Sequence, residues 1–268
     1  MLLVSTDSFF IRLARTEAWN MAFLVAAFSL PVFLMLNRVV ETAGPVASLR
    51  RAGRPLLLLA TLTAISHVSF ITSVTRTSVA NVVVIVAAAP VAAAVAARVL
   101  LGERTSTRVW TAIAITVGGV VTVVAASLGR PNLGGDLLAV LAIVAFALSI
   151  TIWRRHPDLS RYVALALSSV IVLVVTAPFA DLAGLEGRTY AAAAAMGLIF
   201  SPAGRIAHSS APRFAPAAEV ALFAPVETVA ATIWAWLAFA EVPTTATVIG
   251  GMVVLAGVFY GTLGSGRG

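Results

Sequence analysis

The stretch AEVALFAPVETVAATIWAWLAFAE, Ala218 to Glu241, is apolar and long enough to cross a membrane as a helix, yet Glu227 stands near its middle. A bilayer core about 30 Å thick needs about 20 apolar residues in a helix. The predicted helix begins at residue 216, so Glu227 lies about 11 residues into it, which is about 16 Å deep at 1.5 Å per residue. A carboxylate at that depth costs about 2.5 to 3.5 kcal/mol on insertion scales. It is therefore expected to face a cavity or a partner, or to be protonated.

The whole chain has the composition of an integral membrane protein. Of its 268 residues, 60% are hydrophobic and 11% are charged, whereas soluble domains are about half apolar and a quarter charged. The loops are too short for a soluble domain. Apolar stretches separated by Arg, Pro and Gly predict an all-α fold of ten transmembrane helices: 1–14, 18–37, 55–75, 79–101, 107–128, 136–153, 161–180, 189–207, 216–239 and 244–263.

The basic residues predict how this chain is oriented. Its net charge of +7 comes from 18 arginines, most of which fall in alternate loops. Because cytoplasmic loops carry the arginine excess, both termini are expected on the cytoplasmic side of the inner membrane if helix 1 spans. The scattered arginines form no basic groove with aromatics, so nucleic acid is not an expected partner. The absence of cysteine excludes disulfides and thiolate metal sites.

The two halves of the chain resemble each other. A shift of 138 residues lays Ala80–Val121 on Ala218–Phe259 with 10 identities in 42, and both blocks contain a helix, an acidic turn and a helix. Five helices per half is an odd number, so the second copy must enter the membrane from the opposite side. We therefore predict two inverted repeats, residues 1–128 and 133–264, an architecture associated with secondary transporters.

Two segments carry a resemblance to a known family: TSVANVVVIVAAAPVAAAVAARVLLGER, residues 77–104, and APRFAPAAEVALFAPVETVAATIWAWLAFAEVPTTATVIGGMVVLAGV, residues 211–258. They resemble the two EamA-like repeats of the drug/metabolite transporter superfamily. The resemblance implies ten helices, a central cavity lined mainly by helices 1, 3, 4, 6, 8 and 9, and transport of small metabolites such as amino acids. The chain departs from the family at helix 1, which is short, and at Glu227-Thr228, where Glu-Pro is usual. Pro225 is expected to supply the kink instead.

Helix 9 offers the main candidates for a substrate or proton pathway. Glu227 is predicted to couple transport to protons or to bind a substrate amine; the alternative is a protonated acid bonded to a neighbouring helix. Trp234 shares its face by seven-residue spacing and would pack a substrate or an ammonium group, whereas Thr228 borders the same region at most. Glu219, in the first turn of this helix, and its repeat counterpart Asn81 would mark the two mouths, although capping alone also explains Glu219.

Other helices offer further candidates for the same pathway. His67 in helix 3 would relay protons because imidazole changes charge near neutral pH, unless it is a neutral, hydrogen-bonded core residue. In helix 8, Ser201 with Pro202 is expected to open the backbone, and Arg205 to meet a substrate carboxylate or Glu219, unless it only serves topology. Asp7 in helix 1 is likewise a candidate for the pathway, unless it has only a structural role.

The remaining acidic and glycine positions are given structural roles. Glu103 and Glu241 lie in repeat-related turns, where a structural role is favoured over transport. Gly118, Gly119, Gly250, Gly251, Gly257 and Gly261 allow close helix contact in helices 5 and 10. These helices would also form the contact if the protein is a homodimer.

The sequence thus predicts a secondary transporter, most simply an exporter of a small metabolite such as an amino acid, with the lipid bilayer as its surroundings. No phosphate-binding loop is present, and no cofactor, metal or catalytic residue is expected. A membrane-embedded enzyme built on His67 or His208 has no supporting motif. The alternative is a non-transporting scaffold or receptor on a transporter fold, for which the short helix 1 is the support.

Overall fold

The structure, a computed structural model, describes residues 6–77, 79–124, 132–239 and 244–262, and within these ranges it is helical with no strand. The helices are α1 (Thr6–Ala14), α2 (Ala18–Val40), α3 (Pro45–Ala52), α4 (Arg54–Arg76), α5 (Val79–Ala87), α6 (Ala89–Leu101), α7 (Thr107–Val124), α8 (Leu133–Arg155), α9 (Arg161–Thr176), α10 (Gly187–Ala195), α11 (Ser201–Ser210), α12 (Ala217–Ala221), α13 (Ala224–Phe239) and α14 (Thr245–Thr262). A π-helical turn, η3 (Met196–Phe200), joins α10 to α11.

Local sequence signals set several of the helix ends. The Asn132 side chain accepts a hydrogen bond from the Gly135 amide at the start of α8, and Ser160 caps α9 in the same way through Val163. Both are preferred N-cap residues because their side-chain oxygens satisfy a free amide of the first turn. At the end of α6, Gly102 adopts the left-handed conformation that glycine tolerates best.

Six spans among the described residues are long and apolar enough to cross a membrane: Ala18–Val40, Arg54–Ser73, Asn81–Leu101, Leu133–Arg155, Arg161–Phe179 and Thr245–Thr262. The outer faces of these helices expose large apolar side chains, among them Val174 at 68% and Met252 at 59%. Such side chains are stable against lipid tails rather than water. The described chain therefore has the length and surface of a membrane-embedded bundle.

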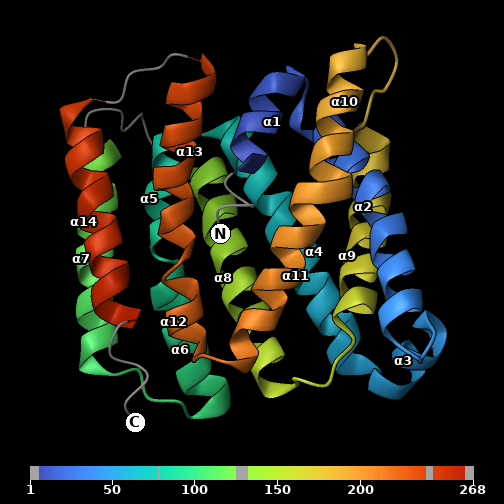
Figure 1. Ribbon diagram of the computed structural model, residues 1–268, viewed down its shortest axis with the longest axis horizontal. Coiled ribbons are helices and arrows are strands. Elements are labelled where there is room, and N and C mark those ends of the chain that lie inside the picture. The colour runs from blue at the N-terminus through green and yellow to red at the C-terminus, as the bar shows by residue number, and fades with distance from the viewer. Residues whose placement is uncertain (1–5, 78, 125–131, 240–243, 263–268) are drawn as a thin grey trace.

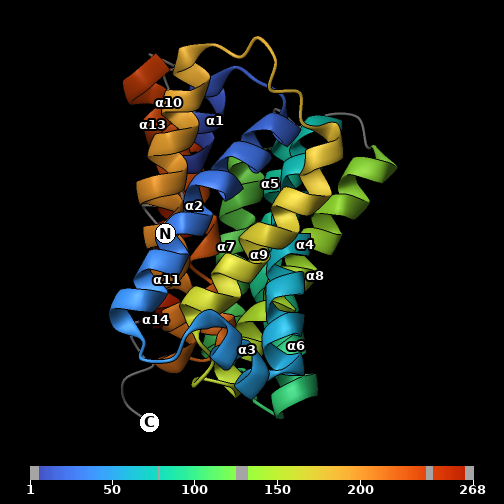
Figure 2. The ribbon, with the colours of Figure 1, turned by 90° about the vertical axis from the view of Figure 1, so that its right-hand side faces the viewer.

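The long helices run side by side and most of them extend along the vertical direction of Figure 1, while the short α3 lies at one end of the bundle. α7 packs against α14 at one edge, α4 packs against α8, and α2 packs against α9 (Figures 1 and 2). α6 lies between α8 and α12 and contacts both. The bundle therefore joins helices that are far apart in the sequence.

The described arginines gather at one end of this bundle. The lower end in Figure 1 holds α3 with Arg50 and Arg51, the α6–α7 connection with Arg104, and the end of α8 with Arg155. We call it the arginine-rich end. Of the described residues, Arg12 and Arg15 in and after α1, Arg76 at the end of α4 and Arg188 in α10 belong to the opposite side. This distribution is the one that the sequence predicted for the loops.

Glycines bring the backbones of α7 and α14 into direct contact. A Cβ on Gly250 would lie 2.6 Å from the Gly119 carbonyl oxygen, and a Cβ on Gly257 would lie 2.5 Å from the Thr116 hydroxyl oxygen. Small residues permit such close approach of membrane helices. Gly118 faces outward instead, with nothing within 4 Å of its Cβ position. The expected close packing therefore occurs within one chain.

The described part of helix 1 is short and packed among other helices. α1 occupies only the half of the bundle away from the arginine-rich end (Figure 1) and contacts α10, α13 and α2. Ala14 at its end is buried with Met21 and Ala193, and the Thr189 hydroxyl donates a 2.8 Å hydrogen bond to the Ala14 carbonyl. α1 therefore covers part of α13, the helix that carries Glu227.

Candidate functional site

Two helices of the bundle are broken, one in the first half of the chain and one in the second. The first break separates α5 from α6 at Ala88, immediately before Ala89 and Pro90. The second separates α12 from α13 at Leu222 and Phe223, before Ala224 and Pro225. Proline lacks the amide that would continue the helical ladder and its ring clashes with the preceding turn. The break at Pro225 was expected, whereas the apolar pattern predicted one uninterrupted helix over residues 79–101.

The broken helices release backbone groups from regular helical bonding. At the first break the Ala88 amide bonds to the Ile85 carbonyl at 3.0 Å, three residues back. At the second, the Phe223 amide bonds to Val220 at 3.3 Å and the Val226 amide to Phe223 at 3.1 Å. Such shortened turns interrupt the regular helical bonding, and in a membrane-spanning region this is tolerated where protein or a cavity surrounds the backbone.

The two broken helices lie against each other at their breaks. Ala89, the first residue of α6, and Ala224, the first residue of α13, are buried in one cluster with Ile143 of α8. Beyond the breaks, α12 packs along α6 through alanines, including Ala93, Ala97 and Ala221. Alanine side chains let the two backbones approach closely. The starts of two half-helices, one from each half of the sequence, therefore meet inside the bundle.

Glu227 stands in the first turn of α13, directly after the second break, and is half-buried. The amino end of a helix carries a partial positive charge that favours an anion in the first turn. α12 extends from the break towards the arginine-rich end and α13 towards the opposite end (Figure 1). Glu227 therefore lies between the two ends of the bundle, where the sequence expected it.

The two aromatic residues further along α13 differ little in exposure. Trp234 is 36% exposed and Trp236 is 49% exposed. A role of Trp234 in lining the pathway stays a prediction, as does the place of Trp236 in the aromatic belt of the membrane interface. The Thr228 side chain lies outside the described part of the structure, as does that of Asp7 in α1.

α10 and α11 meet at a wide π-helical turn just before Ser201 and Pro202. A Cβ on Gly197, inside this turn, would lie 2.6 Å from Phe28 Cβ of α2, and the Gly197 carbonyl accepts a 2.9 Å hydrogen bond from the buried Ser29 hydroxyl. The opened backbone is thus satisfied by a side chain from another helix. Ser201 is 2% exposed, and its hydroxyl has no hydrogen-bond partner among the described residues.

Arg205, His208 and Ser201 share one face of α11, since they are spaced by three or four residues. Arg205 is half-buried and lies within electrostatic range of His67, which is half-buried in α4. The His208 ring stacks on Phe146 of α8, with ring centroids 5.0 Å apart and planes 27° apart. Phe146 also contacts the cluster at the two breaks. The sequence did not reveal this partner, although the spacing on α11 was visible.

Asn81 begins a chain of polar contacts at the end opposite the arginines. Its amide donates to the Thr77 hydroxyl at 3.3 Å, and Thr77 donates to the Asp136 carboxylate at 2.8 Å. A Cβ on Gly135, beside Asp136, would lie 2.7 Å from Thr77 Cβ. α4, α5 and α8 are therefore tightly joined at this end.

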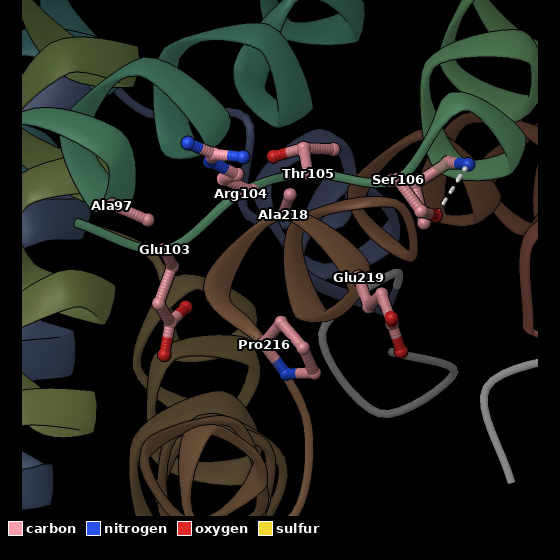
Figure 3. A pocket seen from close by; sticks show the side chains of 9 residues that line it. Ala97, Glu103, Arg104, Thr105, Ser106, Pro216, Ala218 and Glu219 are labelled. Atoms are coloured by element: carbon pink, nitrogen blue, oxygen red, sulfur yellow. Dashed lines mark hydrogen bonds between the residues drawn. The ribbon is translucent and has the colours of Figure 1, made fainter. Parts of the chain in front are cut away.

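Glu219 lines a small pocket at the arginine-rich end, on α12. The pocket has a cavity volume of about 90 Å³, and Figure 3 shows it between the α6–α7 connection and the start of α12. Its lining residues are Ala97, Glu103, Arg104, Thr105, Ser106, Val109, Pro216, Ala218 and Glu219. Glu219 and Asn81 therefore stand near opposite ends of the bundle, and their role as the two mouths of a pathway stays a prediction.

An ion pair fastens this end of the bundle. The Arg154 guanidinium of α8 donates to the Glu103 carboxylate at 3.0 Å and to the Pro212 carbonyl at 3.0 Å. It thereby ties the α6–α7 connection to α8 and to the segment before α12. This contact gives Glu103 the structural role that was expected of it, while Glu241 lies outside the described residues.

Comparison with known proteins identifies the class to which this molecule belongs. The family model of the EamA-like transporter family matches residues 1–125 and 133–262. The chain belongs to this family, and it is therefore a multi-pass membrane transporter of the drug/metabolite transporter superfamily. The family consists of transporters rather than enzymes.

Solved structures support the same fold. One of them, described only as the crystal structure of a protein, superposes with a TM-score of 0.84 at 15% sequence identity, over 98% of this chain and 94% of its own. Among curated proteins none matches this sequence significantly. A sequence identity of 15% shows that the two proteins share a fold, and it does not indicate the substrate of this one.

Proposed function

We propose that this protein exports a small zwitterionic or amphipathic metabolite, such as an amino acid, by alternating access coupled to protons. The observation that carries the proposal is the meeting of two broken helices, with Glu227 in the first turn of one of them. Discontinuous helices in corresponding positions of two halves are typical of substrate sites in secondary transporters. The amino end of α13 favours a substrate carboxylate, and Glu227 would hold the substrate ammonium group.

Electrostatics gives the coupling scheme. An uncompensated carboxylate is costly between the two ends of a membrane-embedded bundle, so the protein would reorient readily only when Glu227 carries a proton or pairs with a substrate cation. Proton and substrate would then occupy Glu227 alternately and move in opposite directions. Trp234, His67, Ser201 and Arg205 would line the pathway from the same core, and Glu219 and Asn81 its two mouths.

The architecture we propose is ten membrane helices in two inverted repeats. Counting each broken helix once and setting aside α3, the segments are α1, α2, α4, α5–α6, α7, α8, α9, α10–α11, α12–α13 and α14. The glycine contacts support the repeat: Gly119 meets Val254, and Gly257 meets Thr116. A shift of 138 residues converts each of these pairs into the other, as a two-fold relation between the halves requires.

The arginine distribution supports an orientation with the arginine-rich end in the cytoplasm, hence in the inner membrane with a cytoplasmic C-terminus. In this orientation the pocket beside Glu219 is the cytoplasmic mouth of the pathway. The Arg154–Glu103 ion pair would help to close that mouth.

The test compares intracellular and extracellular metabolites in cells that express the wild type, Glu227→Gln or Glu186→Gln at equal membrane levels. Glu186 is an exposed acid outside the proposed pathway and serves as the control. Export of a compound by the wild type, its retention by Glu227→Gln and little change with Glu186→Gln would support the proposal and supply the substrate class. Glutamine keeps the size and a polar end group but can neither carry the charge nor take up and release the proton.

Two other outcomes would overturn parts of the proposal. Equal export by wild type and Glu227→Gln would make Glu227 a packed structural acid. If no metabolite pool responds to the wild type, outward transport is not its activity, and a non-transporting scaffold or receptor becomes the better explanation.

A further inference from the structure

A second concave surface lies on the outside of the bundle, between α6 and α7 at the arginine-rich end. It has a volume of about 360 Å³ and is lined by Ala94, Val95, Arg98, Val99, Arg104, Thr105 and Trp110. We call it the outer groove. It borders the pocket of Glu219 through Arg104 and Thr105, which line both. Its walls face outward, since Val99 is 74% exposed and Trp110 42% exposed.

The two arginines of the outer groove do not bind other described residues of the protein. Arg98 and Arg104 are exposed and make no ion pair or hydrogen bond with another described residue, and Figure 3 shows Arg104 and Glu103 pointing to opposite sides of the connection. The neighbouring arginines, in contrast, are bound: Arg154 to Glu103 at 3.0 Å, Arg155 to the Leu100 carbonyl at 3.1 Å and Arg108 to the Tyr260 carbonyl at 2.6 Å. The groove therefore presents two guanidinium groups to an outside anion.

The positions of these side chains match the layers of a lipid leaflet. Arg98 lies one turn before the end of α6, and Trp110 lies in the first turn of α7. Tryptophan and arginine at such depths favour the membrane interface, where a charged head group meets an apolar chain. Deeper along α6, the exposed Val95 and Val99 are four residues apart on one face and continue the groove as an apolar wall.

We infer that the outer groove binds an anionic phospholipid, whose phosphate lies between Arg98 and Arg104 and whose acyl chain lies along Val95 and Val99. The inference rests on the proposed orientation, because the cytoplasmic leaflet is the one rich in anionic lipids. Basic pockets at that side of membrane helices are suited to anionic head groups. A zwitterionic lipid fits less well because its ammonium group would meet the same two arginines.

The test measures lipid affinity directly and so does not depend on transport. Purified full-length protein is titrated with dioleoylphosphatidylglycerol or dioleoylphosphatidylcholine, and the bound fraction is read by native mass spectrometry. Each arginine near a lipid surface contributes about fivefold in affinity, so Arg98→Gln/Arg104→Gln should weaken phosphatidylglycerol binding by about 25-fold. The matched control is Arg50→Gln/Arg51→Gln on α3, which removes the same charge from exposed positions at the same end.

A second measurement locates the lipid. Brominated phosphatidylglycerol should quench the fluorescence of the wild type more than that of Trp110→Phe, and brominated phosphatidylcholine should show little of this difference. The proposal is overturned if the groove variant binds phosphatidylglycerol like the wild type or if the α3 control loses as much affinity. It is equally overturned if the wild type and Trp110→Phe are quenched alike, a result that needs no arginine variant to fold.

Discussion

Two helix pairs join the halves of this transporter, and they are built differently. α7 and α14 are continuous over 18 residues each and touch through their backbones at Gly119, Gly250 and Gly257. The α5–α6 and α12–α13 pair touches through alanine side chains and is broken at both crossing points. The first pair contains no proline, whereas the second has Pro90 and Pro225 just after its breaks.

This difference suggests that the two helix pairs have different roles: α7 and α14 support the bundle, whereas the broken pair forms the functional site. Glycine contacts leave no room for movement, because backbone meets backbone, and α7 and α14 thus form a fixed wall. Leu222, at the second break, packs against Gly261 of α14 and Ala112 of α7. The broken helix therefore rests on the rigid pair, while α13 also contacts α1, and Ala224 at its start packs with Ile143 of α8.

The largest effect on stability is expected where backbones touch. Gly250→Ala would place its Cβ 2.6 Å from the Gly119 carbonyl oxygen, and overpacking of this kind costs about 1–3 kcal/mol. Thermal unfolding of the purified protein should show the loss. Gly118→Ala is the control, since its Cβ meets nothing within 4 Å, and it should stabilise α7 by about 0.5–1 kcal/mol. Equal effects of the two variants would contradict the rigid-wall interpretation.

Removing the second break should affect transport rather than folding. Pro225→Ala restores an amide that can bond to the Ala221 carbonyl and continue α12 into α13, so we expect unchanged or higher thermal stability and a several-fold loss of export. Transport of the identified substrate into vesicles measures this. Pro31→Ala is the matched control, because Pro31 lies inside α2 without interrupting it. Full export by Pro225→Ala would mean that the break is not needed.

The smallest effect is expected from the ion pair at the arginine-rich end. Arg154 and Glu103 are each 30% exposed, and partly exposed pairs contribute about 0.2–1 kcal/mol. Arg154→Gln should lower the free energy of unfolding by no more than this, measured by chemical denaturation. Arg188→Gln, which loses a more exposed pair with Glu186, should change nothing measurable. A loss above about 2 kcal/mol would show that Arg154 holds the two halves together, beyond the strength of a surface pair.

Much of the fold was predictable because a membrane helix requires a run of about 20 apolar residues, and such runs are visible in the sequence. The expected helix ranges are helical where they are described, apart from the breaks and the end residues Ala180, Pro216 and Thr244, and Pro225 indicated one of the breaks. The break at Ala88 was missed even though Pro90 was visible, because an apolar run of 23 residues outweighed a single proline in the pattern. Glu227 was chosen as a candidate for the opposite reason, since one charge in an apolar stretch is conspicuous, and its role stays a prediction.

The sequence by itself determined that this chain is a membrane bundle with an arginine-rich end, an internal resemblance and an acid at mid-depth, because burial in lipid constrains every residue of a helix directly. Only the tertiary structure decided that the two breaks meet, that Phe146 stacks on His208, and that Arg98 and Arg104 face outward while Arg154 pairs with Glu103. These relations depend on which helix faces which and at what distance. Periodicity along one helix contains no information about the rotation and depth of its neighbour.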